Sequence, residues 1–299
     1  MAFPTSRYAD LGLLPGQSID VRGAEEDRQA CLVFAPEDAL LVVCLPLQGL
    51  DDRAFARALR LITPEERARA GRFHFEKDQK LYVAAHGLLR YLLGLAGDCD
   101  PLGLRFTAGA HGKPALVCPP RQLAAAAMPV FNISHCDGMV SCALARPGLE
   151  AAGAAVAVGV DVECLARRPV DLGLARRYFR AEEEAQILAF PEPQRQQAFL
   201  AFWTLKEAII KADGRGLTLA LDSFAFELDA AFRPTSLFFA PRLNQAVAQW
   251  QVLRFHPSAR HLGAVALRRQ AGVGTQESSA TQDPPPGRRR HLQLQDFPG

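Results

Sequence analysis

The segment over residues 202–211, FWTLKEAIIK, restricts what this chain can fold into more than any other stretch. At about 100° per helical residue, its apolar side chains line one face together with Phe199, as expected for a helix buried in a core. Lys206 projects from the middle of this face. Either its stem is buried while its ammonium reaches solvent, or the ammonium reaches an anionic group in a cleft beside the helix. The chain must therefore build a core around a helix that carries charge.

Strand and helix patterns surround this segment and predict a mixed α+β protein. A capping box formed by Thr63 and Glu66 starts one helix, and Gly214 marks the end of the helix that contains FWTLKEAIIK. Further regular segments are a helix over 77–95 and strand-like runs over 39–47, 129–146 (with a turn at Asp137–Gly138), 155–163 and 222–268. Each half of the chain thus has strands on both sides of one long helix.

These patterns divide the chain into two halves of similar size, 1–147 and 155–270, joined by a short connection. Residues 271–299 lack the apolar side chains that a core needs. We therefore expect a disordered tail whose deletion leaves activity unchanged.

The composition excludes several classes of protein. The 299 residues carry a net charge of +2, which is too balanced for generic nucleic-acid binding. No apolar run reaches the roughly 20 residues of a membrane span, and the N-terminus shows no signal-peptide pattern. The seven cysteines are scattered without a CxxC pair, which argues against a zinc site or a disulfide framework. We expect a cytoplasmic protein that binds neither nucleic acid nor membranes.

One strand and one helix carry acidic groups suited to a metal site. In GVDVE, Asp161 and Glu163 project to the same face of a strand, and neighbouring carboxylates need a cation or strong donors to stay ionised. Such oxygen ligands suit Mg²⁺; the alternative is a solvent-facing edge of the sheet. Glu207 and Lys211, four residues apart, are either a helix-stabilising pair or, if the strand packs beside the helix, a third carboxylate and a cation for a polyphosphate.

Two loop or strand-end motifs add polar groups. His135 follows Asn-x-Ser at the end of a predicted strand, where it is either a structural histidine or part of a ligand site. Lys113 lies between Gly112, which allows close approach of the backbone, and Pro114, which stiffens the loop.

Four motifs follow one another in order: GKP at 112–114, FNISH at 131–135, VGVDVE at 158–163 and FWTLKEAIIK at 202–211. This ordered set resembles the 4′-phosphopantetheinyl transferases of the Sfp-like class, and the resemblance extends over roughly residues 60–225. It implies two similar α+β halves related by pseudo-twofold symmetry, each with a small antiparallel sheet packed on a long helix, in a monomeric protein.

The resemblance also implies roles for acidic and basic residues of the last three motifs. Asp161 and Glu163 match the family's Mg²⁺ ligands, and Glu207 matches a third metal ligand or the general base. His135 and Lys211 match groups that contact the pyrophosphate of coenzyme A and take part in catalysis.

Other positions match the remainder of the coenzyme A site. Lys113 and Arg69 match positions near the 3′-phosphate and adenosine end, Ser134 belongs to the same site, and Lys206 matches a phosphate contact. Under this hypothesis the opening helix is one wall of a cleft for pyrophosphate and metal. Glu183 matches an acidic position without an assigned role.

Two departures from the family pattern stand out. Cys136 occupies a position where relatives often carry serine, and Glu66 occupies a position that is often basic, which removes one expected 3′-phosphate contact.

The implied reaction transfers the 4′-phosphopantetheine group of coenzyme A to a serine of an acyl, aryl or peptidyl carrier protein and releases 3′,5′-ADP. Carrier domains are usually acidic, so a basic and apolar docking surface is expected. The alternatives are another Mg²⁺-dependent enzyme acting on a nucleotide or phosphate, which needs no carrier protein, and an inactive protein that only binds carriers. The preferred carrier does not follow from the sequence.

Overall fold

The computed structural model describes residues 31–34, 40–109, 111–118, 128–145, 156–166 and 169–269. The predicted connection over 147–154 and the predicted tail over 271–299 lie outside these residues. Within them, no helix is long and apolar enough to cross a membrane.

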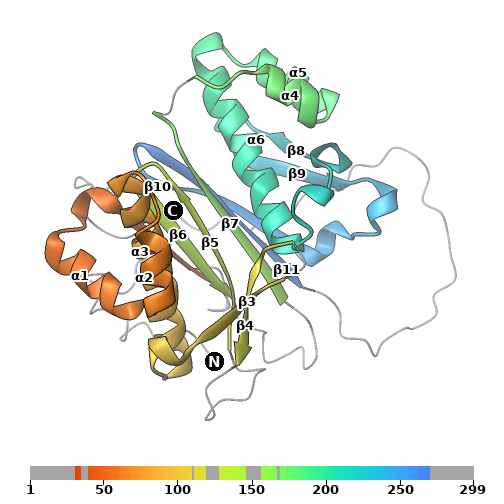
Figure 1. Ribbon diagram of the computed structural model, residues 1–299. Coiled ribbons are helices and arrows are strands. Elements are labelled where there is room, and N and C mark those ends of the chain that lie inside the picture. The colour runs from red at the N-terminus through yellow and green to blue at the C-terminus, as the bar shows by residue number, and fades with distance from the viewer. Residues whose placement is uncertain are drawn as a thin grey trace, which may run out of the picture.

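The N-terminal half is built on a four-stranded antiparallel sheet in the order β1-β2-β6-β5. Its strands are β1 (Cys31–Phe34), β2 (Leu40–Pro46), β5 (Val130–Cys136) and β6 (Met139–Ala145). The long helix α3 (Glu76–Gly97) packs against this sheet, and α1 (Asp52–Leu61) and α2 (Pro64–Ala70) pack against α3 (Figure 1). A separate hairpin, β3 (Arg105–Ala108) and β4 (Pro114–Cys118), completes the half.

The C-terminal half has a three-stranded antiparallel sheet in the order β10-β11-β7. Its strands are β7 (Val156–Cys164), β10 (Trp250–Ser258) and β11 (His261–Arg269). Helix α6 (Glu192–Asp213) packs on it, preceded by α4 (Gly173–Tyr178) and α5 (Ala181–Ala189) and followed by the hairpin β8 (Phe224–Leu228) and β9 (Pro234–Phe239). Short 3-10 turns lie at Leu47–Gly49, Pro101–Gly103, Gly216–Thr218, Leu221–Ser223, Pro241–Leu243 and Val247–Gln249.

The order of elements repeats between the halves. Each has a strand (β2 or β7), a helix of 22 residues (α3 or α6), a separate hairpin (β3-β4 or β8-β9) and a last hairpin (β5-β6 or β10-β11). In each half the second strand of the last hairpin pairs with the strand that precedes the helix. The expected pair of similar α+β halves, each with a small antiparallel sheet on a long helix, is therefore confirmed.

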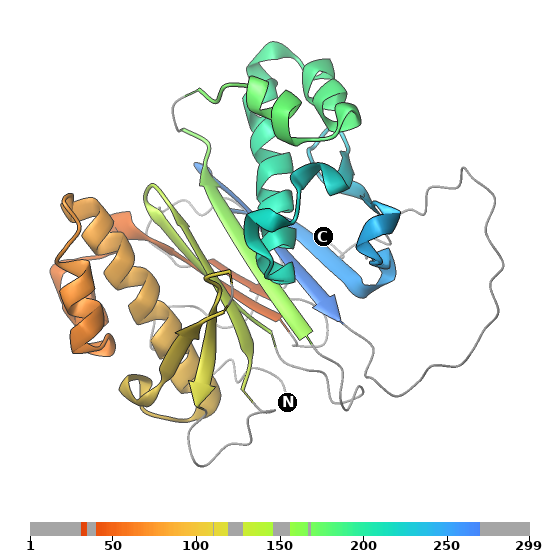
Figure 2. The ribbon, with the colours of Figure 1, turned by 45° about the vertical axis from the view of Figure 1, so that its right-hand side comes forward.

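The two sheets lie between the two long helices, as Figure 2 shows. One core joins α3 to its sheet and a second joins α6 to the other sheet. A third core fills the space between the sheets and contains Val158, Val160 and Val162 of β7. Because side chains alternate along a strand, the residues between these valines, Asp161 among them, face away from that core and toward α6.

The predicted helix boundaries are confirmed where the sequence contained capping residues. Thr63 accepts a hydrogen bond from the Glu66 amide while Glu66 accepts one from the Thr63 amide, and α2 begins at Pro64. Helix α6 ends at Gly214, whose φ of 85° lies in the left-handed region that favours glycine.

Candidate active site where the two halves meet

The site is centred on the carboxylate of Asp161, which is only 5% exposed. Its Oδ1 atom accepts hydrogen bonds from Ser134 Oγ of β5 at 2.9 Å and from Lys211 Nζ of α6 at 2.6 Å. Lys211 Nζ also donates to Ser134 Oγ at 2.9 Å. One strand from each half and one helix therefore meet in a closed triangle of polar side chains.

Gly159 allows α6 to lie this close to β7. A Cβ atom at this position would overlap the carbonyl oxygen of Ala208 and the amide nitrogen of Ala212, and would lie 2.9 Å from the carbonyl carbon of Lys211. All three are backbone atoms of α6, which cannot rotate away. The glycine thus sets the distance at which Lys211 reaches Asp161.

Glu207 and Glu163 bring further negative charge to the same place. Burial raises the pKa of Glu207, and the charges of Asp161 and Glu163 raise it further, while Lys211 acts in the opposite direction. Asp161 and Glu163 therefore lie close enough to Glu207 for their charges to affect it. Lys211 makes its short ion pair with Asp161, so the simple helix pair between Glu207 and Lys211 is not the interaction that forms.

The residues around Asp161 fit a divalent cation. Its second oxygen, Oδ2, is buried without a hydrogen-bond partner, and a buried carboxylate oxygen in that state favours a bound cation. Among the described residues, however, no group of three or more His, Cys, Asp or Glu side chains is already placed to hold a metal. Asp161 is thus the residue best placed to bind a cation, with Glu163 and Glu207 nearby.

His135 lies next to Ser134 on β5, and its side chain is exposed. Desolvation of the ring and the charge of Lys211 lower its pKa, whereas Asp161 and Asp78 of α3 raise it. The charges of Lys211 and Asp161 therefore both act on His135.

Lys113 is placed differently from the expectation of a 3′-phosphate contact. Its Nζ atom donates to three backbone carbonyls, those of Lys211 at 2.6 Å, Val158 at 3.0 Å and Ala212 at 3.3 Å. Burial lowers its pKa to about 8. The ammonium is thus bound by the end of α6 and by β7.

Lys206 also differs from the expected phosphate contact. It is fully buried, and its Nζ atom donates to Glu183 at 2.8 Å and to the carbonyls of Leu221 and Phe224 at 2.7 Å each. These three acceptors use all the protons of the ammonium. Lys206, in the middle of the apolar face, therefore connects α6 to α5 and to the start of β8. Glu183, which had no assigned role, is its counter-ion.

Arg69 and Glu66 lie on α2, at a distance from this triangle. Arg69 is exposed, with its guanidinium 5.9 Å from the centre of the Tyr82 ring. Glu66 is held by both ends of the Arg90 guanidinium, at 2.8 and 3.0 Å. The acidic departure at Glu66 is thus explained by a structural ion pair with α3.

Asn132 is a site residue that the motif analysis passed over. Its Oδ1 atom accepts a hydrogen bond at 2.8 Å from the amide of Val160, next to Asp161, and the side chain is 5% exposed. The available indication was its position two residues before Ser134, which puts both side chains on the same face of the strand.

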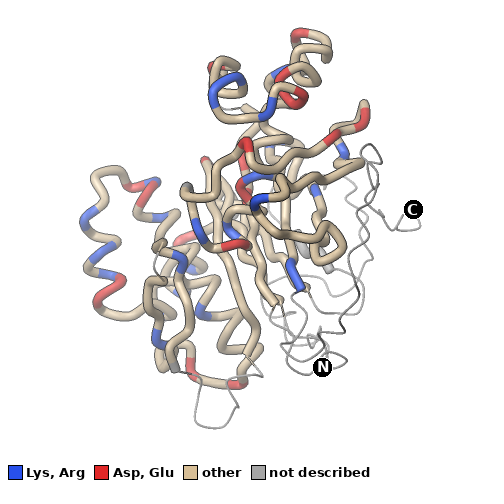
Figure 3. The backbone as a smooth tube through the Cα atoms, turned by 90° about the vertical axis from the view of Figure 1, so that its right-hand side faces the viewer, with Lys and Arg blue, Asp and Glu red and all other residues tan. Residues whose placement is uncertain are grey.

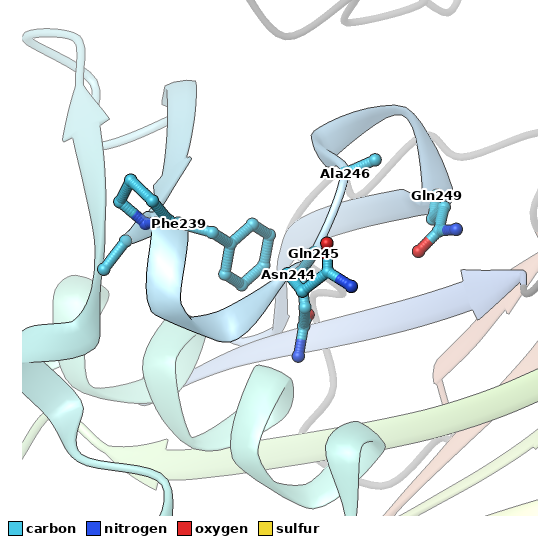
Figure 4. A pocket seen from close by; sticks show the side chains of 7 residues that line it. Phe239, Asn244, Gln245, Ala246 and Gln249 are labelled. Atoms are coloured by element: carbon cyan, nitrogen blue, oxygen red, sulfur yellow. The ribbon is translucent and has the colours of Figure 1, made fainter. Parts of the chain in front are cut away.

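Charged side chains and a pocket also lie elsewhere in the described part of the chain. Acidic and basic positions are interspersed over both halves, as Figure 3 shows. A pocket of about 480 Å³ lies at the end of β9 and the turns that follow it (Figure 4). It is lined by Phe239, Ala240, Pro241, Asn244, Gln245, Ala246 and Gln249, none of which is titratable.

Comparison with known proteins matches both halves to one family. Residues 157–266 match the "4′-phosphopantetheinyl transferase superfamily", and residues 51–146 match "4′-phosphopantetheinyl transferase, N-terminal". The 4′-phosphopantetheinyl transferase HetI of Nostoc sp. is 32% identical over 216 residues, which are 72% of this chain and 81% of HetI. Sfp of Bacillus subtilis is 31% identical over 173 residues, 58% of this chain and 69% of Sfp.

Two more distant matches were also found. The human L-aminoadipate-semialdehyde dehydrogenase-phosphopantetheinyl transferase is 28% identical over 78% of this chain and 75% of its own length. Among solved structures, the holo-[acyl-carrier-protein] synthase of Thermotoga maritima matches with a TM-score of 0.30 and 24% identity over 38% of this chain and 63% of that one. Because HetI and Sfp match across most of their lengths and the family matches cover both halves, this chain belongs to the 4′-phosphopantetheinyl transferase superfamily, as an enzyme of the Sfp-like class.

Proposed function

We propose that the Asp161 triangle is the place where this transferase moves the 4′-phosphopantetheine group of coenzyme A to a serine of a carrier protein. The observation that carries the proposal is the buried Asp161 carboxylate, held by Ser134 and Lys211 through Oδ1 and left without a partner at Oδ2. A carboxylate in this state suits a site that receives a cation together with phosphates.

Mg²⁺ is the cation that the ligand chemistry favours. Asp161 would hold it, with Glu163 and Glu207 as further oxygen ligands directly or through water. When bound, Mg²⁺ neutralises charge on the pyrophosphate oxygens.

The chain's own residues would orient coenzyme A. Lys211 is half-buried at the centre of the site, so its ammonium can shift from Asp161 to a phosphate oxygen over a short distance. His135 is exposed beside it and can donate to the same pyrophosphate. Arg69 is exposed on α2 and suits the 3′-phosphate, since arginine matches phosphate geometry.

The reaction needs a base for the carrier serine. Glu207 suits this role because it is a carboxylate on α6 beside the Asp161 site, one turn before Lys211. The serine oxygen forms a bond to the β-phosphorus as its proton passes to Glu207, and the bond from that phosphorus to the oxygen of 3′,5′-ADP breaks. Transfer of this kind depends mainly on positioning and electrostatics.

The carrier partner should meet the basic side of the N-terminal half. Arg53, Arg57 and Arg60 are all exposed along α1, at spacings that place them on adjacent turns. An acidic carrier helix would complement this row.

The test measures transfer of a fluorescent coenzyme A to purified apo carrier domains of the fatty-acid, polyketide and peptide types, with MgCl₂ present. The variant Asp161→Asn should lose transfer and keep the wild-type melting temperature. Asp171→Asn, the same change at an exposed aspartate before α4, is the matched control. Wild-type rates in Asp161→Asn would refute the assignment. Coenzyme A that binds the wild type without reaching any carrier would favour the inactive carrier-binding protein.

A further inference from the structure

The hairpin turn between β3 and β4 belongs to the N-terminal half but lies against the end of α6 in the C-terminal half. The side chain of Lys113 would be 3.8 Å from a Cβ atom built at Gly214, and His111 would be 3.6 Å from one built at Gly216. Among the described residues of this turn, the Gly109 amide donates to the Lys113 carbonyl at 2.8 Å, and Gly112 has a φ of 80°. These contacts hold Lys113 against the end of α6.

The C-terminal end of a helix favours a bound ammonium group. The last carbonyls of a helix have no partners within it, and they carry the negative end of the helix dipole. Lys113 satisfies two of them, those of Lys211 and Ala212, and adds the carbonyl of Val158 on β7. A single side chain therefore ties three segments together: the hairpin, the helix and the strand.

Lys211 is the residue that connects this contact to the reaction. Its carbonyl accepts from Lys113 at 2.6 Å, while its own ammonium pairs with Asp161 at 2.6 Å. Holding the main chain of Lys211 therefore limits where its ammonium can lie. On the same side, Asn132 holds β7 through the amide of Val160, so the N-terminal half fixes both elements that carry the site.

We propose that Lys113 is a positioning residue, which clamps the end of α6 to the N-terminal half and so places Lys211 for transfer, and that it does not bind the 3′-phosphate of coenzyme A. This proposal rests on the proposed function for the role of Lys211, but the clamp itself is independent of that function. Arg69, exposed and free of ion pairs among the described residues, remains the candidate for the 3′-phosphate.

The decisive experiment compares coenzyme A with 3′-dephospho-coenzyme A as substrates for Lys113→Met and Arg69→Met. Loss of the clamp should lower kcat on the order of tenfold to a hundredfold, equally for both substrates and with unchanged KM. Loss of a 3′-phosphate contact should raise KM for coenzyme A alone, as we expect of Arg69→Met. Lys80→Met, which removes an exposed lysine on α3, controls for the loss of one positive charge.

Hydrogen exchange supplies a readout that needs no activity. In Lys113→Met, the amides at the end of α6 and in the following turn, residues 210–216, should exchange faster than in the wild type. If the wild type transfers nothing to any carrier, the proposed function fails, while this measurement still decides the clamp. Lys113→Arg keeps a cation with several donors and should retain most of kcat, which provides a test if the methionine variant does not fold.

The proposal is overturned by either of two results. One is a defect of Lys113→Met that appears with coenzyme A and disappears with the dephospho form. The other is wild-type kcat together with wild-type exchange over 210–216.

Discussion

Substituting Gly159 with alanine should separate α6 from β7 and disable the site without changing any polar residue. The added Cβ would overlap backbone atoms of Ala208 and Ala212 and lie 2.9 Å from the carbonyl carbon of Lys211, where ordinary van der Waals contact begins at 3.4 Å. Because helix backbone cannot rearrange locally, α6 as a whole must retreat by about 1 Å to restore carbon–carbon separations.

Two effects follow from this displacement. Overpacking of a filled core costs typically about 1–3 kcal/mol of unfolding free energy, and the clash here is with backbone, so we expect the upper part of that range. The retreat also carries Lys211 and Glu207 away from Asp161. A misplacement of about 1 Å can lower a rate by around a hundredfold, so transfer should fall far more than stability alone would explain.

The assay is urea unfolding followed by circular dichroism, together with transfer kinetics under conditions where the variant is fully folded. Gly103→Ala is the matched control, because a Cβ at that exposed position meets nothing within 4 Å. Wild-type stability and wild-type kcat in Gly159→Ala would refute the claim that close approach of α6 to β7 builds the site.

Two further substitutions test the charged groups. Glu207→Gln should abolish transfer yet raise the melting temperature at pH 8. Burial and the charges of Asp161 and Glu163 raise the pKa of Glu207, so an ionised Glu207 lowers the stability of the folded protein above that pKa. The gain in melting temperature from Glu207→Gln should therefore fade as the pH falls and Glu207 becomes protonated. A gain in melting temperature that grew at low pH would contradict this. Lys206→Met should destabilise the fold by about 3–5 kcal/mol in urea unfolding, since it leaves Glu183 as a lone charge that is 1% exposed. The double variant Lys206→Met/Glu183→Leu should recover much of this loss, and a double variant no more stable than the single one would count against the ion pair as the cause.

The sequence predicted the fold best where local chemistry determines structure. Thr63 and Glu66 define the start of α2, and Gly214 defines the end of α6, because caps satisfy backbone groups within a few residues. The hairpin at Asp137–Gly138 follows from its turn residues. The order of the strands in each sheet depends on contacts across the whole chain, and the sequence did not predict it; the family resemblance implied only a small antiparallel sheet on a long helix in each half.

Side-chain partners were predicted less well than side-chain proximity. Alternation along β7 predicted that Asp161 and the neighbouring valines face opposite sides of the strand, and the structure agrees; that α6 covers the Asp161 side was left open by the sequence. Lys113 donates to backbone carbonyls up to 99 positions away in the sequence, and Lys206 to backbone carbonyls up to 18 positions away. Every residue has a backbone carbonyl, so the sequence does not show which ones accept these hydrogen bonds. A lysine that caps a helix end therefore looks the same in sequence as one that binds a phosphate.

This distinction changes the charge balance of the site. With Lys113 and Lys206 each committed to carbonyls, Lys211 is the lysine left to face the carboxylates of Asp161, Glu163 and Glu207. Ionised, these three outnumber its single charge, and coenzyme A adds more negative charge. Coulomb repulsion between such groups is strong in a partly buried site. Under the proposed function we therefore expect coenzyme A to bind together with a divalent cation, and its binding to weaken when that cation is removed.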